Sequence, residues 1–363
     1  MDDNYLISVI VPVFNAELYI KRGIESILLQ NIDDIQIVLV DDGSTDNSGT
    51  ICDEFTDYNN VVVIHQKNSG ATVARNAGLA KAQGKYITFM DADDYFEENA
   101  FSSINNILNH YDPDLLDFGY YYLSSTLEKI PVLNGNNKNE LLDLEYIIND
   151  IIPPVINMTS DKSKFIFDFV WGKVFKKNII IKNNIYFDEN RRVWEDRPFL
   201  AQYLKYCKTY YSIDQFFYNY VNVDGSLSQR FSTEFPRIVL ENYQLYYSLY
   251  KNNYDFSCQY VSNYWGNTIE NIIIKQLENK KEHPEVVDVI RQVLKESQVL
   301  IWFENREISK NFQKEIVSCL RQNKYDKVIE IYENIIKKNK TFENSRKFCN
   351  KVKVIMRKLL KDS

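Results

Sequence analysis

Three carboxylates stand within four residues of one another, at Asp91, Asp93 and Asp94, directly after an apolar stretch over 85–90 that predicts a buried strand. Like charges this close together are costly unless a cation lies among them. Hard divalent ions such as Mg²⁺ and Mn²⁺ bind oxygen ligands, usually one or two protein carboxylates together with phosphate oxygens. The stretch therefore indicates a nucleoside diphosphate held through its metal. The alternative is an acidic turn followed by a helix cap.

Alternating strand and helix patterns surround this acidic stretch. Apolar runs predict strands over 6–14, 35–40 and 61–64, and helical spacing predicts helices over 19–30 and 71–82. Such alternation is typical of a parallel sheet with right-handed crossovers. In open sheets of this class, ligands bind beyond the carboxyl ends of the strands. We therefore expect four loops to meet in one cleft: 12–17, 41–48, 66–70 and 91–94.

The later part of the chain changes character. Aromatic runs predict strands over 115–123 and 210–220, and acids in a first helical turn predict a helix over 195–206. Beyond about residue 233 the pattern is helical, with helices predicted over 234–252, 258–279, 285–303, 312–321 and 324–338. The segment 345–361 has an apolar stripe surrounded by Lys and Arg, which is typical of a basic amphipathic helix.

Composition excludes several classes of protein. The 363 residues have a net charge of -7, which gives no general case for a nucleic-acid partner. The five cysteines form no Cys-x-x-Cys pair and no two of the three histidines have ligand spacing, which argues against zinc chemistry. No glycine-rich phosphate loop follows the first strand, which disfavours dinucleotide enzymes, P-loop NTPases and sugar nucleotidyltransferases. Neither a signal peptide nor a membrane-spanning run is evident, so we expect a cytoplasmic protein.

Five ordered motifs resemble those of the family-2 glycosyltransferases of the GT-A fold, which are inverting enzymes with nucleotide-sugar donors. The motifs are VIVPVFN over 9–15, VDDGSTD over 40–46, NSG over 68–70 with ARN over 74–76, DADD over 91–94, and WED over 194–196. The resemblance covers about residues 6–230. It implies an α/β fold, Rossmann-like, with a mostly parallel sheet flanked by helices and an all-helical C-terminal extension. The implied domains are 1–230, with a donor half of about 1–125 and an acceptor half of about 126–230, and 231–363.

The resemblance also implies roles for single residues. Asp41 would accept a hydrogen bond from the base, or else belong to a well-capped turn; Arg75 would approach the base or diphosphate, or else form a surface salt bridge. Asp91 and Asp93 would bind Mn²⁺ or Mg²⁺, while Asp94 would cap a helix beginning near Glu97. The full set implied to bind the nucleotide-sugar is Pro12, Phe14, Asn15, Glu17, Asp41, Asp42, Asn68, Gly70, Arg75, Asp91, Ala92, Asp93 and Glu195.

The catalytic role falls to Asp196. Inversion requires a base that deprotonates the acceptor hydroxyl on the face opposite the departing diphosphate. The resemblance gives this role to the Asp of the Glu195–Asp196 pair, with burial and Glu195 offsetting the pKa-lowering helix dipole. The alternative is plain capping of the helix by two acids. The neighbouring Trp194 could stack on an acceptor sugar or simply pack.

One departure concerns the segment after the last predicted strand. Relatives often have a basic residue there, whereas 221–226 (VNVDGS) has none, so Arg230 or the metal would have to steady the diphosphate.

These features predict a metal-dependent inverting glycosyltransferase. It would move a hexose or N-acetylhexosamine from a UDP-sugar to a hydroxyl of a glycan, lipid-linked or glycoprotein acceptor in bacterial surface polysaccharide or glycoprotein glycan synthesis. The alternative is a non-catalytic sugar-nucleotide-binding subunit that scaffolds an assembly complex. The basic segment 345–361 would contact the inner face of the membrane, or dock on the preceding helices or on another subunit of a homo-oligomer.

Overall fold

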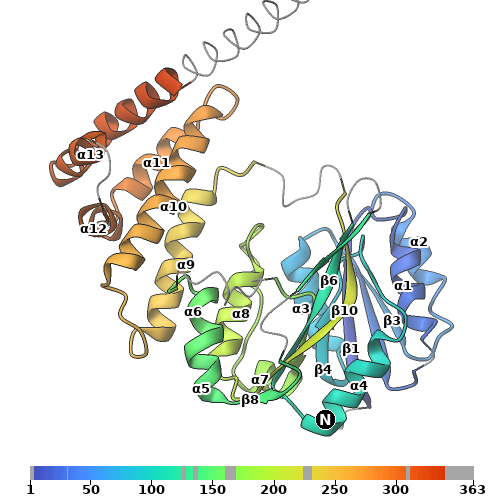
Figure 1. The fold of residues 1–363 in the computed structure, drawn as a ribbon. Helices are drawn as coiled ribbons and strands as arrows, with labels where there is room; N and C mark the ends of the chain where they lie inside the picture. The colour runs from blue at the N-terminus through green and yellow to red at the C-terminus, as the bar shows by residue number, and fades with distance from the viewer. Residues whose placement is uncertain are drawn as a thin grey trace, which may run out of the picture. The chain divides into compact units, whose positions relative to one another are not determined.

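A computed structural model of the chain describes residues 4–30, 32–123, 128–133, 138–159, 169–223, 231–307 and 311–339. Contacts divide the chain into two compact units (Figure 1). The first comprises Met1–Arg230 together with Ser248–Tyr250, and the second comprises Phe231–Tyr247 together with Lys251–Ser363.

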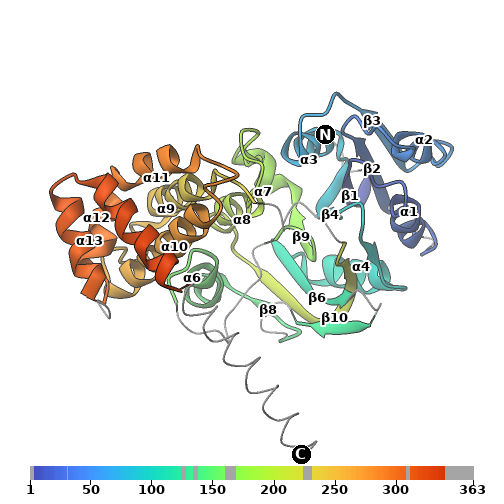
Figure 2. The same ribbon diagram turned by 90° about the horizontal axis from the view of Figure 1, so that it is seen from above.

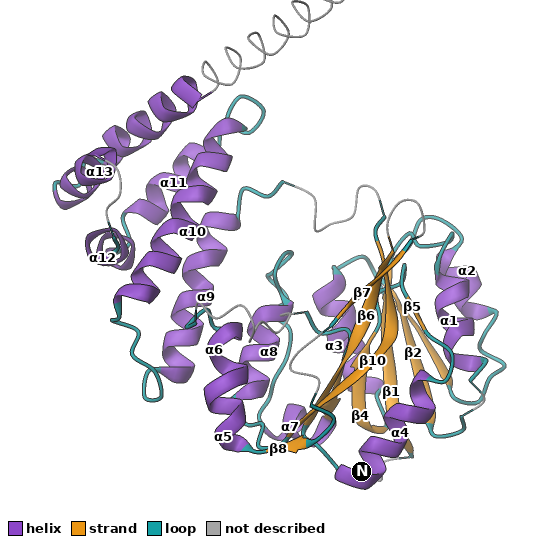
Figure 3. Cartoon of the chain, in the orientation of Figure 1, coloured by secondary structure: helices purple, strands orange, loops and turns teal. Residues whose placement is uncertain are grey.

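A mixed sheet forms the centre of the first unit, with helices on its faces (Figure 3). The described strands follow the order β3-β2-β1-β4-β9-β6-β10-β5, while β7 pairs with β6 and β8 pairs with β10. Their bounds are β1 (Tyr5–Val13), β2 (Ile35–Asp41), β3 (Val61–His65), β4 (Gly84–Phe89), β5 (Tyr95–Phe96), β6 (Leu115–Leu123), β7 (Lys129–Val132), β8 (Leu141–Leu142), β9 (Lys173–Lys176) and β10 (Tyr210–Val221).

Strand direction separates two parts of this sheet. Strands β3, β2, β1 and β4 are mutually parallel, as the strand–helix alternation predicts, and β6 is parallel to β10. Between these two groups lies β9, which is antiparallel to both β4 and β6. The carboxyl ends of β1, β2, β3 and β4 therefore share one edge, where the predicted site loops begin.

Helices cover both faces of this sheet (Figure 2). Alternate residues of β1 divide between the faces: Ile7 packs in a cluster with Ile27 of α1, whereas Ile10 meets α3 at Gly78. A Cβ at Gly78 would lie 2.3 Å from Ile10 Cγ2, so a glycine is needed for this close approach. The helices of this unit are α1 (Ile20–Leu28), α2 (Ser48–Asp53), α3 (Ala71–Lys81), α4 (Ala100–Tyr111), α5 (Leu144–Tyr146), the π-helix Ile147–Ile151, α6 (Ile152–Val155), α7 (Lys177–Lys182) and α8 (Asp196–Leu204).

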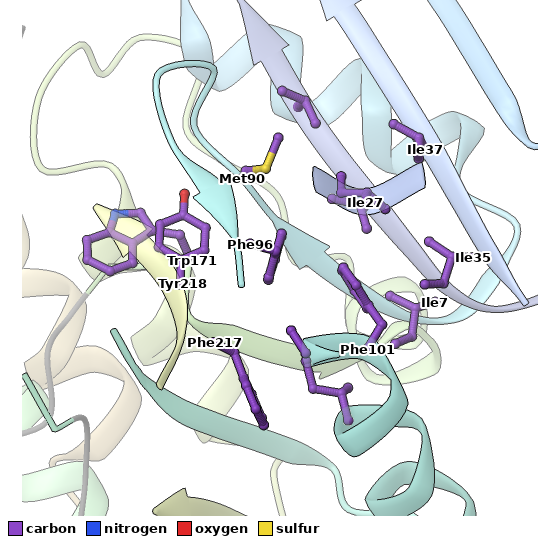
Figure 4. Close-up of a cluster of buried hydrophobic side chains, with 14 of the residues drawn as sticks. Ile7, Ile27, Ile35, Ile37, Met90, Phe96, Phe101, Trp171, Phe217 and Tyr218 are labelled. Atoms are coloured by element: carbon purple, nitrogen blue, oxygen red, sulfur yellow. The ribbon is translucent and has the colours of Figure 1, made fainter. Parts of the chain in front are cut away.

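The core on the α1 face extends from the parallel strands to the second part of the sheet (Figure 4). Ile7, Ile35 and Ile37 of β1 and β2 lie at one end of the cluster, and Trp171 and Tyr218 lie at the other. Phe96 connects them, with its ring centroid 5.2 Å from that of Tyr218. One continuous core therefore supports the strands on both sides of β9.

The second unit is helical over its described residues. Its helices are α9 (Phe235–Tyr250), α10 (Gln259–Glu278), α11 (Val286–Leu294), α12 (Ser297–Asn305), α13 (Asn311–Arg321) and a last helix over 325–339. The single helix predicted over 285–303 is wrong: Glu296 has an extended backbone (ψ 126°) that separates α11 from α12. The prediction of an α/β sheet with flanking helices and a helical C-terminal region is confirmed.

A buried ion pair lies at the centre of the helical unit. The Arg306 guanidinium donates to both carboxylate oxygens of Glu270, at 3.0 and 3.1 Å, and the Tyr332 hydroxyl donates to the same carboxylate at 3.1 Å. Each partner thus has its charge compensated inside the core.

Among the described residues, no helix is both long and apolar enough to cross a membrane. The predicted basic helix over 345–361 lies outside those residues.

Candidate active site

The loops after β1 and β2 are held together by their polar side chains. The Asn15 backbone N–H donates to Ser44 Oγ (3.1 Å), and Asn15 Oδ1 accepts from the Thr45 backbone N–H (2.8 Å). Glu17 Oε2 accepts from the backbone N–H of Asn47 at 3.0 Å. Asn15 has a φ of 50°, a left-handed backbone that asparagine tolerates better than most residues. These contacts fix the loop that follows β1, and the Phe14 ring is left 47% exposed beside it. Pro12 itself still belongs to β1, where it pairs with Val40 of β2.

Asp41, at the end of β2, has partners for both carboxylate oxygens. Oδ1 accepts from the Ser44 backbone N–H at 3.0 Å, and Oδ2 lies 2.9 Å from His65 Nδ1. Burial opposes ionisation of Asp41, but the hydrogen bonds from Ser44 and His65 outweigh it and hold its pKa below the usual value. Asp41 is therefore an ionised acid that organises the turn after β2.

Asp42 organises the loop after β3. Its Oδ1 accepts from Gln66 Nε2 (2.7 Å) and from the Ser69 backbone N–H (2.8 Å), and its Oδ2 accepts from the Gly70 backbone N–H (2.7 Å). Gly70 has a φ of 97°, and a Cβ there would lie 1.8 Å from Arg192 Nη1. The carboxylate of Asp42 thus holds the backbone of this loop, and the positive φ at position 70 favours glycine.

Asn68 belongs to the same tightly packed region. A Cβ on Gly43, in the turn after β2, would lie 2.7 Å from the Asn68 backbone nitrogen. The loops after β2 and β3 therefore approach each other backbone to backbone.

Arg75 joins the acidic turn after β4 to the acid pair at the start of α8. Its Nη2 donates to Asp91 Oδ1 at 2.9 Å, while its Nη1 donates to Glu195 Oε1 at 2.9 Å and to Asp196 Oδ1 at 3.2 Å. The side chain is only 5% exposed, so the alternative of a surface salt bridge is wrong. Burial opposes the charge, but the three carboxylates raise the pKa of Arg75 further above its usual range.

Asp196 is the first residue of α8, and both oxygens of its carboxylate accept hydrogen bonds from outside that helix. Oδ1 accepts from Arg75 and Oδ2 accepts from the Val170 backbone N–H at 3.2 Å. Glu195, in the N-cap position, makes no capping hydrogen bond with its side chain, so plain capping does not account for the pair. Burial raises the pKa of Asp196 to about 7; Arg75 opposes this rise, and Glu195 and Asp91 add to it.

Trp194, immediately before the acid pair, has a φ of 55°. A left-handed backbone is rare for a bulky residue, and such strain is concentrated at functional sites. The turn at Trp194 directs Glu195 and Asp196 toward Arg75.

Asp94 has a structural task different from the expected one. Its Oδ2 accepts from the Tyr218 hydroxyl (2.7 Å) and its Oδ1 accepts from the Val221 backbone N–H (2.8 Å). The expectation that Asp94 caps the following helix is wrong, since that helix begins at Ala100 with Asn99 as its N-cap. The Tyr218 hydroxyl also accepts from the Asp91 backbone N–H at 3.0 Å, which fastens the acidic turn to β10.

Asp91 and Asp93, on either side of Ala92, have the chemistry of a divalent-metal site. Burial and the charge of Asp91 raise the pKa of Asp93 to about 6, against the attraction of Arg22. A divalent cation would relieve that repulsion, and carboxylate oxygens are the ligands that Mg²⁺ and Mn²⁺ prefer. In the part of the chain that the structure describes, no group of three or more His, Cys, Asp or Glu could hold a metal. The two carboxylates therefore fit an ion whose remaining ligands are phosphate oxygens or water.

Two arginines that lie beside the predicted loops belong to none of the five sequence motifs. Arg22 Nη2 donates to the Asp93 carbonyl at 2.9 Å, and its guanidinium lies 4.4 Å from the Tyr95 ring centroid. Arg192 Nη1 donates to the Ser69 carbonyl at 2.5 Å. These are cations near the acidic turn and the Gly70 loop, whereas Arg230 lies outside the described residues.

Known proteins resemble this chain in sequence and in fold. The family described as Glycosyl transferase family 2 matches residues 8–171. The chain is 32% identical over 243 residues to glycosyltransferase GlyG of Streptococcus pneumoniae, covering 65% of this chain and 77% of GlyG. It is 30% identical over 233 residues to the uncharacterized glycosyltransferase EpsJ of Bacillus subtilis, covering 62% of this chain and 63% of EpsJ. It is 34% identical over 233 residues to the minor teichoic acid biosynthesis protein GgaB of Bacillus subtilis, covering 61% of this chain and 24% of GgaB.

Solved structures show the same fold. Residues 1–349 of TarS from S. aureus, in complexes with UDP and with UDP-GlcNAc, match with a TM-score of 0.60 over 91% of both chains. At 17% identity this likeness shows a shared fold.

Proposed function

The chain belongs to glycosyltransferase family 2, and we propose that it transfers a sugar from a UDP-sugar to a hydroxyl of a glycan acceptor with inversion at the anomeric carbon. One observation supports this more than any other: Arg75 contacts both Asp91, in the proposed metal pair, and Asp196, the proposed base. A donor-binding acid and an acceptor-activating acid are therefore separated by a single guanidinium. Their shared partner brings the two acids to one site, as a reaction at a single sugar requires.

Asp196 is the proposed general base. A base acts best when its pKa lies near the working pH, and burial brings that of Asp196 to about 7. Its Oδ2 is held by the Val170 backbone N–H and its Oδ1 by Arg75, so the carboxylate has a fixed direction before the acceptor arrives. Asp196 would take the proton of the acceptor hydroxyl as that oxygen attacks the anomeric carbon.

Asp91 and Asp93 would hold Mg²⁺ or Mn²⁺, which when bound neutralises charge developing on the departing diphosphate. Arg75 keeps Asp91 in place from the side of the acid pair. Arg22 fixes the Asp93 carbonyl. The protein's contribution is thus to keep both carboxylates oriented at the end of β4.

The nucleoside would lie against the loops after β1, β2 and β3. Asp41 would recognise the base, and the exposed Phe14 ring offers an apolar surface beside it. Asn15, Glu17 and Asp42 hold the surrounding backbone in place, as their hydrogen bonds indicate. The complexes of TarS with UDP and UDP-GlcNAc support UDP as the nucleotide and an N-acetylhexosamine as a candidate sugar.

The acceptor would belong to a bacterial surface glycan. GgaB is a minor teichoic acid biosynthesis protein by name, which supports a surface polymer as the product to which this chain contributes. The basic segment 345–361 would bring the enzyme to an anionic membrane surface that holds lipid-linked acceptors. Flotation with anionic liposomes would test this: we expect the full chain to float and a chain lacking 341–363 not to, and equal binding would contradict it.

A panel of UDP-sugars tests the proposed reaction. The purified chain, with Mg²⁺ or Mn²⁺ and simple glycosides or a lipid-diphosphate sugar as acceptors, should release UDP with one donor and yield a glycoside of inverted configuration. The alternative, a non-catalytic binding subunit, predicts UDP binding without release. Absence of UDP binding under all conditions would contradict both.

A further inference from the structure

His65, the last residue of β3, stands between two acids that no motif connects with it. Its Nδ1 lies 2.9 Å from Asp41 Oδ2, and its Nε2 lies 3.0 Å from Asp53 Oδ1, near the end of α2. The imidazole is 48% exposed, so protons can reach it from solvent, while Asp41 is only 9% exposed. The arrangement is therefore a bridge from an exposed acid, through histidine, to a buried acid.

The two contacts select one protonation state. A neutral imidazole has a single N–H and can donate to only one carboxylate, whereas an imidazolium donates from both nitrogens. Hydrogen bonds to Asp41 and Asp53 raise the pKa of His65, and they outweigh the opposing effect of burial. The geometry thus matches a cation with two charge-assisted hydrogen bonds.

Helix α2 leaves room for this bridge at Gly49. A Cβ on Gly49 of α2 would lie 2.9 Å from Asp41 Oδ2 and 3.6 Å from His65 Cε1, so the absence of a side chain makes room for the pair. Cys52, also on α2, remains a neutral thiol because burial raises its pKa to about 12. Among the described residues, Asp41 of β2 and Asp53 of α2 are the titratable groups that contact His65, and Cys52 interacts with these two acids.

Hydrogen bonds connect this bridge to the loops of the proposed nucleoside site. Asp41 Oδ1 accepts from the Ser44 backbone N–H (3.0 Å), and Ser44 Oγ accepts from the Asn15 backbone N–H (3.1 Å). Movement of the Asp41 carboxylate would therefore change the turn at Ser44 and, through it, the loop after β1. A group that fixes Asp41 acts on the whole base-binding region.

We propose that His65 is a positioning residue of the nucleoside site: as an imidazolium it holds Asp41 in the direction needed for the base, so nucleotide affinity falls when His65 loses its proton. This inference rests on the proposed function, since it takes Asp41 to face the base. His65 itself need not touch the nucleotide.

Calorimetric titration with UDP at constant Mg²⁺, between about pH 6 and 8.5, tests the proposal. We expect His65→Gln to bind UDP about 5-fold more weakly than the wild type at pH 6, which corresponds to one hydrogen bond. The difference in UDP affinity between the two proteins should become smaller as pH rises, because His65 of the wild type then loses its proton. The phosphate of UDP titrates identically in both proteins and cancels in the ratio. His110→Gln, a change of an exposed histidine on α4, is the matched control and should follow the wild type.

Proton NMR provides the reciprocal readout. The chain has only three histidines, so the His65 signal is identified by its loss in His65→Gln. If UDP prefers the protonated form, saturation with UDP must raise the pKa of His65 by linkage. Equal UDP affinity of His65→Gln and wild type at every pH, with no change in the His65 pKa, would overturn the proposal while leaving UDP binding intact. Failure of the wild type to bind UDP at all would instead contradict the proposed function.

Discussion

At the scale of single residues, the site is a balance between one guanidinium and three carboxylates. Arg75 has hydrogen bonds to Asp91, Glu195 and Asp196, and each of these acids would repel the others without it. One guanidinium neutralises one of the three carboxylates and leaves two in excess, which is consistent with a raised pKa at Asp196. Substitutions here should separate chemistry, binding and stability.

Asp196→Asn should abolish transfer while leaving UDP binding nearly unchanged. The amide keeps the size of the side chain but cannot accept a proton, and loss of a general base costs a factor of ~10²–10⁴ in rate. UDP release from the preferred donor measures the first effect and calorimetry the second. Asp57→Asn, at an exposed position, is the control. Full activity of Asp196→Asn would end the assignment of the base.

The pH profile of transfer should reflect the same residue. A base acts when deprotonated, and the pKa of Asp196 is raised to about 7, so kcat/KM should rise with pH through about 7 and then level off. Initial rates at subsaturating donor give this profile. A rate that is constant from about pH 5.5 to 8 would be incompatible with a titrating base of this pKa.

Arg75→Gln should destabilise the protein by ~3–5 kcal/mol, because it leaves buried acids without a counter-charge. Those acids then bind protons more tightly in the folded than in the unfolded state, so the loss of stability should be smaller at low pH and grow as pH rises. Chemical denaturation at several pH values measures both effects. Lys21→Gln, which breaks an exposed pair with Glu54, should have almost no effect.

At the scale of elements, the loops that follow the strands are held by acids whose carboxylates accept hydrogen bonds from within the protein. Asp42 holds the loop after β3 through Gln66, Ser69 and Gly70. Asp42→Asn loses at least one acceptor for partly buried backbone N–H groups and should cost ~1–3 kcal/mol. It should also weaken UDP binding, because Gly70 opens α3, on which Arg75 lies. Thermal unfolding and calorimetry check both, and unchanged UDP affinity would show that the loop is independent of the nucleotide site.

Sequence periodicity predicted the elements well where they are long. Strand β6 has the predicted bounds Leu115–Leu123, and α3 differs by a single residue at its end. The reversed direction of β9 could not be predicted, because a strand of four residues has no usable period and pairs with strands far away in sequence. The break between α11 and α12 was missed since no Gly or Pro marks it.

The site was predictable in part. The motifs located the acids at 91, 93 and 196, and the structure brings 91 and 196 to one arginine. The common partner of Asp91 and Asp196 could not be foreseen, because 121 residues separate Arg75 from Asp196 and local spacing says nothing about such a contact. Asp94 was misassigned since an Asp before a helical pattern is typical of a cap, whereas tertiary contacts with β10 determine its place. His65 was missed because its two acids come from different elements.

At the scale of the whole molecule, each compact unit has its own buried charge network. Arg306→Met leaves Glu270 buried and unpaired and should destabilise the helical unit by ~3–5 kcal/mol. UDP binding should persist in the folded fraction, because the proposed nucleotide site lies within the first unit. Denaturation followed by fluorescence, alongside UDP calorimetry, separates the two results. Arg321→Met, which removes a solvent-exposed pair with Glu304, is the matched control.

Strand β9 is contributed by residues 173–176, yet it lies between β4 and β6, which both come from the first 125 residues. In a chimaera that joined residues 1–125 of one homologue to the remainder of another, β9 of the second homologue would have to pair with β4 and β6 of the first. Its side chains would face unfamiliar neighbours on both edges, including Thr88, whose hydroxyl donates to the Lys173 carbonyl at 2.9 Å. The part of the chain after residue 125 therefore cannot be exchanged as a unit at this junction, and grafts should keep β4, β9 and β6 from one parent while exchanging only the loops that follow them.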